Sequence, residues 1–239
     1  MGLKESGLRG SLRNVSVGID AIPDSVVYQW RREDFADPWP ANVSDVDMTV
    51  NGLSTTNGFV TGDGTDDHGL ADGPQTLPNN NPDIGLAFTF RTSDVDDIHP
   101  VFAVEDGTER FAVWLGRRTN GAINLEFHDG NDDRYEVETD LTFDDGDAHA
   151  VILNKPDDNP SNLDIFVDDM ENAVDITVQS DSGYDSSELS LNEDLGFFTF
   201  NSSGNIRDES DTDVGIFEFN DEVFSESERK EFVSRRDEV

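Results

Sequence analysis

The sequence of 239 residues contains no cysteine, and its only lysines are Lys4, Lys155 and Lys230. Without cysteine the chain can form neither a disulfide framework nor a thiolate metal site, so its stability must come from packing. No apolar run approaches the ~20 residues that a membrane-spanning helix needs, and we expect no membrane insertion. The N-terminus has neither the apolar stretch of a secretion signal nor paired arginines, so we expect a protein that is made in the cytoplasm and has no signal peptide.

Basic residues are scarce in general, because aspartate and glutamate outnumber lysine and arginine by 53 to 16 and the net charge is −37. No cluster of lysine and arginine is large enough for phosphate contacts, which argues against nucleic acid as a partner. On the ~10,000 Å² surface of a globular chain of this length, the uncompensated carboxylates lie about 17 Å apart. That spacing is inside the ~30 Å screening length of dilute buffer and outside the ~3 Å length of molar salt. The charge therefore favours a protein of a salt-accumulating halophile, either a haloarchaeon or its virus.

Aromatic residues argue against the alternative of an acidic disordered chain. The sequence has 16 phenylalanines, three tryptophans and three tyrosines, whereas disordered acidic segments are poor in aromatics. After residue 25, apolar and polar residues alternate with a period of two in about eleven short runs, as half-buried strands do. The predicted strands are Val26–Trp30, Leu86–Arg91, Val101–Val104, Phe111–Leu115, Ile123–Phe127, Tyr135–Glu138, His149–Leu153, Leu163–Val167, Ala173–Val178, Phe197–Phe200 and Val214–Phe219.

The connections between these runs favour antiparallel pairing. Four of them contain the dipeptides of tight hairpins, namely Asp106-Gly107, Asn120-Gly121, Asp129-Gly130 and Asp145-Gly146. One helix is predicted near the C-terminus, where Ser225 and Glu228 have the spacing of a capping box. The pattern therefore predicts an all-β fold of two packed antiparallel sheets, a sandwich or jelly roll with a short C-terminal helix.

Residues 1–25 differ in character from the rest, and the sequence divides into this segment and a domain over residues 26–239. The first nineteen residues hold three basic residues against Glu5 alone. This segment is either an ordinary frayed terminus or a basic docking arm that contacts an acidic partner or another subunit of an assembly. The residues of the predicted arm are Leu3, Lys4, Leu8, Arg9, Leu12 and Arg13.

Four segments, in this order, resemble elements of the laminin G-like, concanavalin A-like jelly rolls. They are the string TGDGTDDH at 61–68, the strand DGDAHAVIL at 145–153, the strand LDIFVDD at 163–169, and the closing strand and helix start at 213–228. The chain departs from the family at two positions: Ala148 stands where the family has tryptophan, and Asp169 stands where it has glycine. The resemblance implies a two-sheet jelly roll over about residues 26–236.

The opening residues 1–16 and 22–25 also resemble the start of laminin G-like proteins encoded by tailed viruses of haloarchaea. This resemblance implies a virion structural protein, displayed as a capsid decoration, turret or tail-fibre module, that stabilises the particle, adsorbs to host surface glycans, or does both. Its partners would be other virion proteins, bound through the arm, and further copies of itself in a homo-oligomer. A glycan-degrading enzyme on the same fold and a cellular lectin or adhesin are the alternatives.

Acidic loops are the candidates for a metal site. Asp63, Asp66 and Asp67 form the first candidate for a structural Ca²⁺, since calcium binds six to eight oxygen ligands from flexible loops. Similar loops lie at 129–133, 144–147 and 208–213, although solvated carboxylates are the default in so acidic a chain. No cofactor is required. The histidines are scattered without the spacing of a zinc site, and His149 is expected to be a core histidine and not a base.

Aromatic side chains are the candidates for contact with a glycan or another subunit. Phe35 and Trp39 lie in a proline-containing loop that we expect to be exposed, and Tyr135 and Tyr184 could also stack on sugar rings. Trp114 is in mid-strand and is expected in the core. The carboxylate motifs E-x-D-x-x-E and E-x-D-x-E of glycosidases that have this fold are absent, so we assign no catalytic residue and expect no enzyme.

Overall fold

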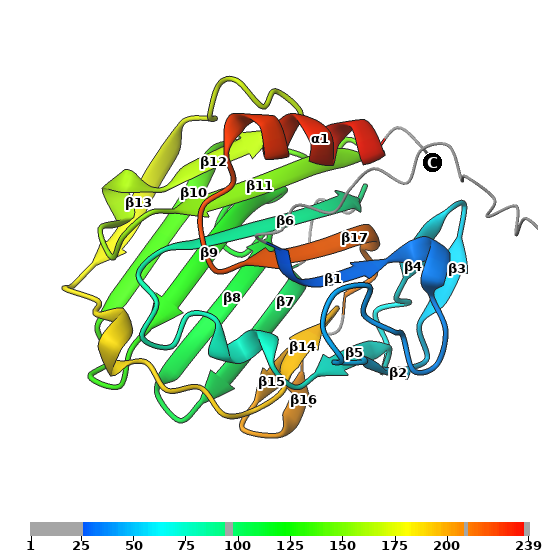
Figure 1. The fold of residues 1–239 in the computed structure, drawn as a ribbon, viewed down its shortest axis with the longest axis horizontal. Coiled ribbons are helices and arrows are strands. Elements are labelled where there is room, and N and C mark those ends of the chain that lie inside the picture. Colours follow the sequence, from blue (N-terminus) through cyan, green and yellow to red (C-terminus); the bar gives the residue numbers. More distant parts are fainter. Residues whose placement is uncertain (1–25, 94–97, 208–209, 237–239) are drawn as a thin grey trace, which may run out of the picture.

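The computed structural model describes residues 26–93, 98–207 and 210–236, and these residues form two β-sheets packed face to face (Figure 1). The seven-stranded sheet has the order β12-β11-β6-β17-β4-β3, and β1 pairs with β17. Its strands are β1 (Val26–Arg31), β3 (Ser54–Thr56), β4 (Phe59–Thr61), β6 (Ile84–Arg91), β11 (His149–Lys155), β12 (Asp164–Val167) and β17 (Asp213–Asn220).

The second sheet has ten strands in the order β13-β10-β9-β8-β7-β14-β5-β2, with β15 beside β7 and β16 beside β15. Its strands are β2 (Thr49–Asn51), β5 (His68–Ala71), β7 (His99–Asp106), β8 (Glu109–Leu115), β9 (Ala122–His128), β10 (Arg134–Thr142), β13 (Ile176–Asp181), β14 (Leu195–Phe197), β15 (Phe200–Ser202) and β16 (Asn205–Arg207). All described strand pairs are antiparallel except β15 with β7. The predicted all-β antiparallel jelly-roll sandwich is confirmed.

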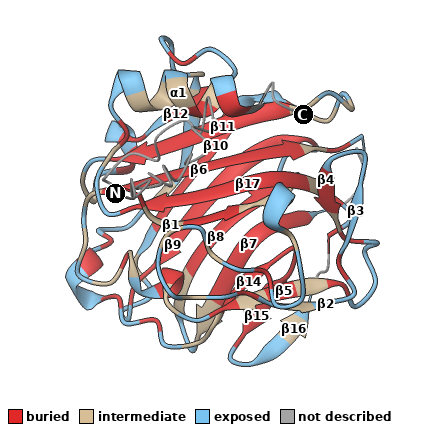
Figure 2. Ribbon diagram, turned by 45° about the vertical axis from the view of Figure 1, so that its right-hand side comes forward, coloured by how far each residue is buried: buried red, intermediate tan, exposed pale blue. Residues whose placement is uncertain are grey.

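Phenylalanines from both sheets form the centre of the core. The Phe102 ring on β7 lies 6.2 Å from Phe88 on β6 and 5.2 Å from Phe219 on β17, and Phe197 on β14 lies 4.6 Å from Phe217. Each fully buried phenylalanine stabilises the fold by roughly 1.5–3 kcal/mol. Figure 2 shows that the long central strands of both sheets are buried along almost their whole length.

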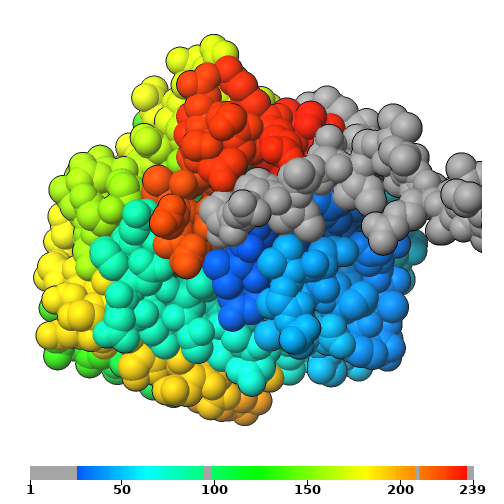
Figure 3. Space-filling model, viewed as in Figure 1, coloured from blue at the N-terminus to red at the C-terminus, as the bar shows by residue number. Residues whose placement is uncertain are grey.

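A single described α-helix, α1 (Glu226–Arg236), covers the outer face of the seven-stranded sheet. Figure 3 shows it, in red, at the top of the view. The predicted capping box begins it: the Ser225 backbone N–H donates to Glu228 Oε2 at 2.7 Å, and the Glu228 N–H donates to Ser225 Oγ at 3.4 Å. Phe232 of α1 and Phe166 of β12 belong to the small apolar cluster between helix and sheet. Within the described part of the chain, no helix is long and apolar enough to span a membrane.

Several sequence predictions differ from the structure. Asp145-Gly146 does not close a hairpin, because it joins β10 in one sheet to β11 in the other. The predicted strand Phe197–Phe200 is divided into β14 and β15 by Phe198, whose φ of +60° interrupts extended backbone. Short strands such as β2, β3 and β16 were not predicted, and four 3-10 turns lie at Arg32–Asp34, Pro74–Thr76, Pro160–Asn162 and Ser186–Glu188. The proposed docking arm, Leu3 to Arg13, lies outside the described residues.

Candidate functional site on the ten-stranded sheet

The loop around Trp39 is exposed at most of its residues, but the Trp39 side chain is buried and Phe35 is half-buried, so the prediction of exposed aromatic rings in this loop is wrong for Trp39. Trp39 is 0% exposed, because its backbone pairs with Met48 and its indole N–H donates to the Arg31 carbonyl at 2.9 Å. Phe35 is half-buried and packs edge-on against the Trp39 ring at 5.3 Å. Trp30 on β1 is also in the core. Trp30 and Trp39 are therefore part of the apolar core and offer no open face to a sugar, and Phe35 packs against that core.

Tyr135 and Tyr184 are also buried, which corrects their prediction as contact residues. Together with Phe127 they surround the Lys155 ammonium, whose Nζ lies 5.4–5.7 Å from the three ring centroids. Lys155 Nζ also donates to Asp158 Oδ1 at 2.8 Å. Burial lowers the pKa of Lys155, and Asp158 opposes that shift. The two tyrosines thus hold a buried cation inside the sandwich.

The three aspartates of the calcium prediction do come together. Ligand oxygens of Asp63, Asp66 and Asp67 lie within 4.8 Å of one another in the loop between β4 and β5. The Asp63 N–H donates to Asp67 Oδ2 at 2.9 Å. Burial raises the pKa of Asp67, and the charges of Asp63 and Asp66 add to the increase. The geometry agrees with the proximity that the sequence indicated, and calcium binding itself stays a prediction.

The outer face of the ten-stranded sheet carries a different cluster, which strand pairing assembles from β8, β9 and β10. In each of these strands one set of alternate residues enters the core and the other set faces outward. The outward residues form cross-strand rows. The first row is Trp114, Asn124 and Glu138, and the second row contains Glu126 opposite Glu136. All five side chains are buried although they face away from the core.

Arginines neutralise the first carboxylate of the second row. Glu126, which is 0% exposed, pairs with Arg110 at 3.1 Å and with Arg117. Arg110 also pairs with Glu105 on β7. Burial lowers the pKa of Arg117, and the neighbouring Glu126 opposes that shift. Glu126 therefore lies between two guanidinium groups.

The second carboxylate, Glu136, is held by a histidine and an arginine. Its Oε1 lies 3.2 Å from His128 Nε2, and its Oε2 accepts from Arg118. The hydrogen bond from His128, followed by the charge and hydrogen bond of Arg118, lowers the pKa of Glu136 to about 2 against the opposing effect of burial. A group with so low a pKa stays deprotonated at neutral pH and cannot act as a general acid.

The loop between β8 and β9, residues 116–121, covers these rows, and we call it the strap. Arg117 lies over the Trp114 ring at 4.8 Å, and Thr119 Oγ1 donates to Glu138 Oε1 at 2.8 Å. Together with the Arg118 contact described above, three consecutive residues of the strap contact both rows. Gly116 and Gly121 are the first and last residues of the strap, and their φ values of +74° and +73° are rarely adopted by residues other than glycine.

Under the strap, each member of the first row has a buried polar atom without a partner. Trp114 Nε1, Asn124 Oδ1 and Glu138 Oε2 make no hydrogen bond to any described residue. Buried polar atoms are normally paired, so three such atoms in one cross-strand row indicate a place for a hydrogen-bonding ligand. The row combines one donor, two acceptors and an aromatic ring, which can contact a polyhydroxylated molecule.

Sequence reasoning missed this site for a physical reason. The sequence segments E-F-H at 126–128 and E-V-E at 136–138 do place charged residues on one face of each strand. Only the register that pairs Glu126 with Glu136 brings them within reach of each other, and only the strap buries them. Trp114 is buried as expected, but it belongs to a small cluster with Ala112 and Phe200 on the outer face and not to the main core.

The predicted core histidine is also in place. His149 on β11 is 7% exposed, and its Nδ1 and Nε2 lie 2.8 Å from Asp168 Oδ2 and 3.0 Å from Asp145 Oδ1. Since carboxylates are acceptors only, an imidazole that bonds to both must donate from both nitrogens and carry a positive charge.

Comparison with known proteins supports the fold. No protein-family model and no curated protein matches the chain. Similar solved structures include the botulinum neurotoxin serotype D binding domain, with a TM-score of 0.62 and 11% identity over 90% of this chain and 52% of that one. Another is the Trypanosoma rangeli sialidase in complex with sialic acid, with a TM-score of 0.62 and 13% identity over 90% of this chain and 34% of that one.

A third similar structure is the botulinum neurotoxin type C protein described as dependent on two ganglioside molecules for cell entry, with a TM-score of 0.65 and 9% identity. The chain spans about half the length of the neurotoxin chains that it resembles and about a third of the sialidase. Identities this low show the fold alone. The chain therefore shares the β-sandwich fold of these structures, consistent with the predicted concanavalin A-like architecture.

Proposed function

We propose that this protein is a non-catalytic glycan-binding protein that recognises sugars on the outer face of its ten-stranded sheet. The observation that carries the proposal is the row Trp114, Asn124 and Glu138, with its three unpartnered polar atoms beneath the strap. A sugar presents hydroxyl groups as donors and acceptors and a C–H face that packs on an aromatic ring. The carboxylates of the second row pair with Arg117 and Arg118 and thereby fix the position of the strap.

Access to the row requires the strap to move. Arg117 and Thr119 shield Trp114 and Glu138, and the flanking glycines Gly116 and Gly121 are the positions where the backbone can rotate with the least steric cost. A bound glycan would replace the contact between Thr119 and Glu138 and supply partners for the unpaired atoms. This exchange supports binding that is selective for hydrogen-bonding ligands.

The ion pairs of Glu126 and Glu136 support a role without catalysis. A glycosidase needs one carboxylic acid that is protonated at working pH, and a pKa of about 2 at Glu136 is the opposite of that requirement. The alternative function, glycan hydrolysis, is favoured by one observation: Glu126 and Glu136 have ligand oxygens within 4.8 Å of each other, close to the ~5 Å separation in retaining glycosidases. Release of new reducing ends that is lost in Glu126→Gln would establish this alternative.

The wider role that we propose is that of a structural protein of a haloarchaeal tailed virus, a capsid decoration, turret or tail-fibre module. The net charge of −37 and the resemblance of residues 1–16 and 22–25 to such proteins support it. In this role the protein stabilises the particle, adsorbs to host surface glycans, or does both, and it is present in several copies. Mass spectrometry of purified particles tests this role, since the protein should be found in a fixed ratio to the shell protein.

Binding to an array of neutral oligosaccharides in molar potassium chloride tests the glycan site. Glu138→Gln replaces the acceptor Oε2 by a donor and should weaken binding at least ~5-fold, as expected for the loss of one hydrogen bond of about 1 kcal/mol. Glu188→Gln, an exposed glutamate outside the row, is the matched control and should bind like the wild type. Equal binding by the two variants would exclude the row as the glycan site.

A further inference from the structure

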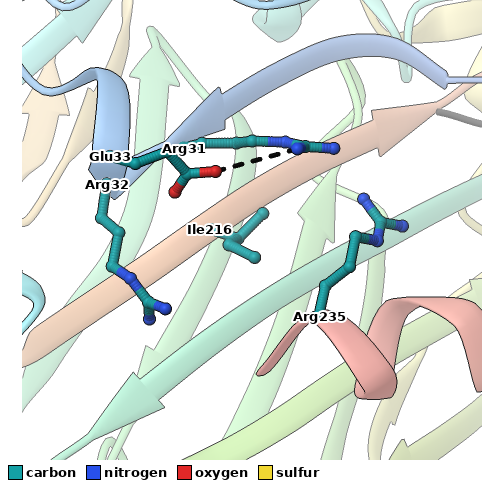
Figure 4. Close-up of a pocket in the computed structure, with 5 residues that line it drawn as sticks. All are labelled: Arg31, Arg32, Glu33, Ile216 and Arg235. Carbon is teal, nitrogen blue, oxygen red and sulfur yellow. Dashed lines mark ion pairs between the residues drawn. The ribbon is translucent and has the colours of Figure 1, made fainter. Parts of the chain in front are cut away.

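A pocket of about 140 Å³ lies on the opposite side of the molecule, where β1, β17 and the end of α1 meet (Figure 4). It is lined by Arg31 at the end of β1, Arg32 and Glu33 in the following 3-10 turn, Ile216 of β17 and Arg235 in the last turn of α1. The pocket is distinct from the strap and from the row at Trp114, which belong to the other sheet.

The charge of this pocket is the reverse of the charge of the chain. Three of the 16 basic residues of the whole sequence line it, against the lining carboxylate of Glu33 and the buried carboxylate of Glu218 behind Arg235, which leaves an excess of positive charge. Glu33 is a weak competitor for these cations, because its side chain is 54% exposed and its Oε1 lies 3.7 Å from Arg31 Nη1. In a protein with one excess carboxylate every ~17 Å, so concentrated a positive charge indicates an anionic ligand.

Two of the arginines are fixed in position by buried partners. Arg235, which is 4% exposed, contacts both carboxylate oxygens of Glu218, and Arg31 Nε donates to Gln29 Oε1 at 2.8 Å. Gln29 in turn donates to Glu218, so one network holds both guanidinium groups. Figure 4 shows both side chains extending beside Ile216.

These fixed arginines nevertheless keep unused donors. Arg31 Nη2 and Arg235 Nε are buried and make no hydrogen bond to any described residue. Guanidinium groups bind carboxylate, sulfate and phosphate groups through two parallel hydrogen bonds, and a buried donor normally has a partner. A volume of 140 Å³ is far larger than the space that one water molecule needs and can hold a carboxylate, sulfate or phosphate group.

We propose that this pocket is an oxyanion-binding site that takes a carboxylate or sulfate group, either as a free anion or as part of an acidic sugar. Arg31 and Arg235 supply the buried donors, Arg32 adds positive charge at the open side, and Glu33 turns outward when the anion enters. The site is independent of the glycan face and does not depend on the function proposed for it.

Titration of the full-length protein with sulfate in molar potassium chloride, followed by NMR shifts of arginine side-chain N–H signals, tests the proposal. The wild type should show saturable binding. Arg32→Gln should weaken it at least ~5-fold, whereas Glu33→Gln should strengthen it, because the competing carboxylate is removed. Arg134→Gln changes an arginine that is 44% exposed on the other sheet and should leave binding unchanged.

Both substitutions at the pocket lie on partly or largely exposed side chains, so the fold should survive them, and the unfolding transition of each variant checks this. The source of the anion is resolved by titrating a glucuronate-containing oligosaccharide and its neutral analogue. If the acidic oligosaccharide binds more than ~10-fold tighter than sulfate and depends on Arg32, the ligand is an acidic sugar. If sulfate binds equally well, the ligand is a free anion. Sulfate shifts that are identical in the wild type and Arg32→Gln, or weaker binding by Glu33→Gln, would overturn the proposal.

Discussion

Asp129 at the end of β9 shows how this chain uses a carboxylate as a structural anchor. It is 1% exposed, its Oδ1 accepts the backbone N–H groups of Asn131 at 2.8 Å and Asp133 at 3.1 Å, and its Oδ2 accepts that of Asp185 at 3.0 Å. Asp129→Ala removes three hydrogen bonds to a charged acceptor, each worth about 1.5–3 kcal/mol. The residues that donate are near the surface, so water can accept hydrogen bonds from the freed N–H groups and offset part of this loss. We therefore expect the free energy of unfolding to fall by about 3 kcal/mol.

Chemical denaturation in molar potassium chloride, together with thermal unfolding, measures this loss. For a chain of this length 3 kcal/mol corresponds to a decrease in melting temperature of about 6–12 °C. Asp147→Ala is the matched control, because it also removes one negative charge but from an exposed side chain. It should cause no measurable loss. If Asp129→Ala is as stable as Asp147→Ala, the hydrogen bonds of Asp129 do not hold the turn, and the reasoning is refuted.

Three further predictions concern salt, pH and calcium. Transfer from molar salt to about 10 mM salt should lower the melting temperature, since the screening length then exceeds the spacing of the excess carboxylates; a melting temperature that does not change with salt would refute the halophilic interpretation. Burial lowers the pKa of His149, but the hydrogen bonds that His149 donates to Asp168 and Asp145 outweigh burial, and the net pKa is raised. The stabilisation by His149 is therefore complete below about pH 6.5 and is lost as the pH rises through the folded-state pKa. Unfolding free energies of the wild type minus those of His149→Gln should decrease over this range, and a difference independent of pH would contradict the assignment. If Asp63, Asp66 and Asp67 bind calcium, a hundredfold excess over Kd should stabilise the wild type by about 2.7 kcal/mol and leave Asp63→Asn unaffected; identical melting with calcium and with chelator would exclude the site.

The parts of the fold that depend on local patterns were predictable from the sequence. Alternating runs such as Phe111–Leu115 predicted the long strands, and the spacing of Ser225 and Glu228 predicted the helix start, because both signals lie within a few residues. Connections that depend on distant packing were not predictable. The Asp145-Gly146 dipeptide has the composition of a hairpin, yet β11 pairs with β6 in the other sheet, because the apolar face of β11 is buried there.

The candidate sites also divide into those that depend on residues close in sequence, which were predictable, and those that depend on distant packing, which were not. Asp63, Asp66 and Asp67 are neighbours in sequence, and their proximity followed from that. The sequence predicts an exposed loop at Trp39 and allows Tyr135 and Tyr184 to stack on sugars if they lie outside the sandwich, but composition does not reveal which face of a loop or strand the sandwich covers. The outer-face rows and the arginine pocket each join residues from different strands, so only the register of the sheets could reveal them.

NMR spectra of a neutral oligosaccharide that binds on the array, recorded over a day with the protein in molar potassium chloride, test the central claim most directly. The account predicts reversible broadening of the sugar signals that weakens in Glu138→Gln, with no new anomeric signals at any time. New anomeric signals that disappear in Glu136→Gln would show that the Glu126 and Glu136 pair cleaves sugars, and would contradict it.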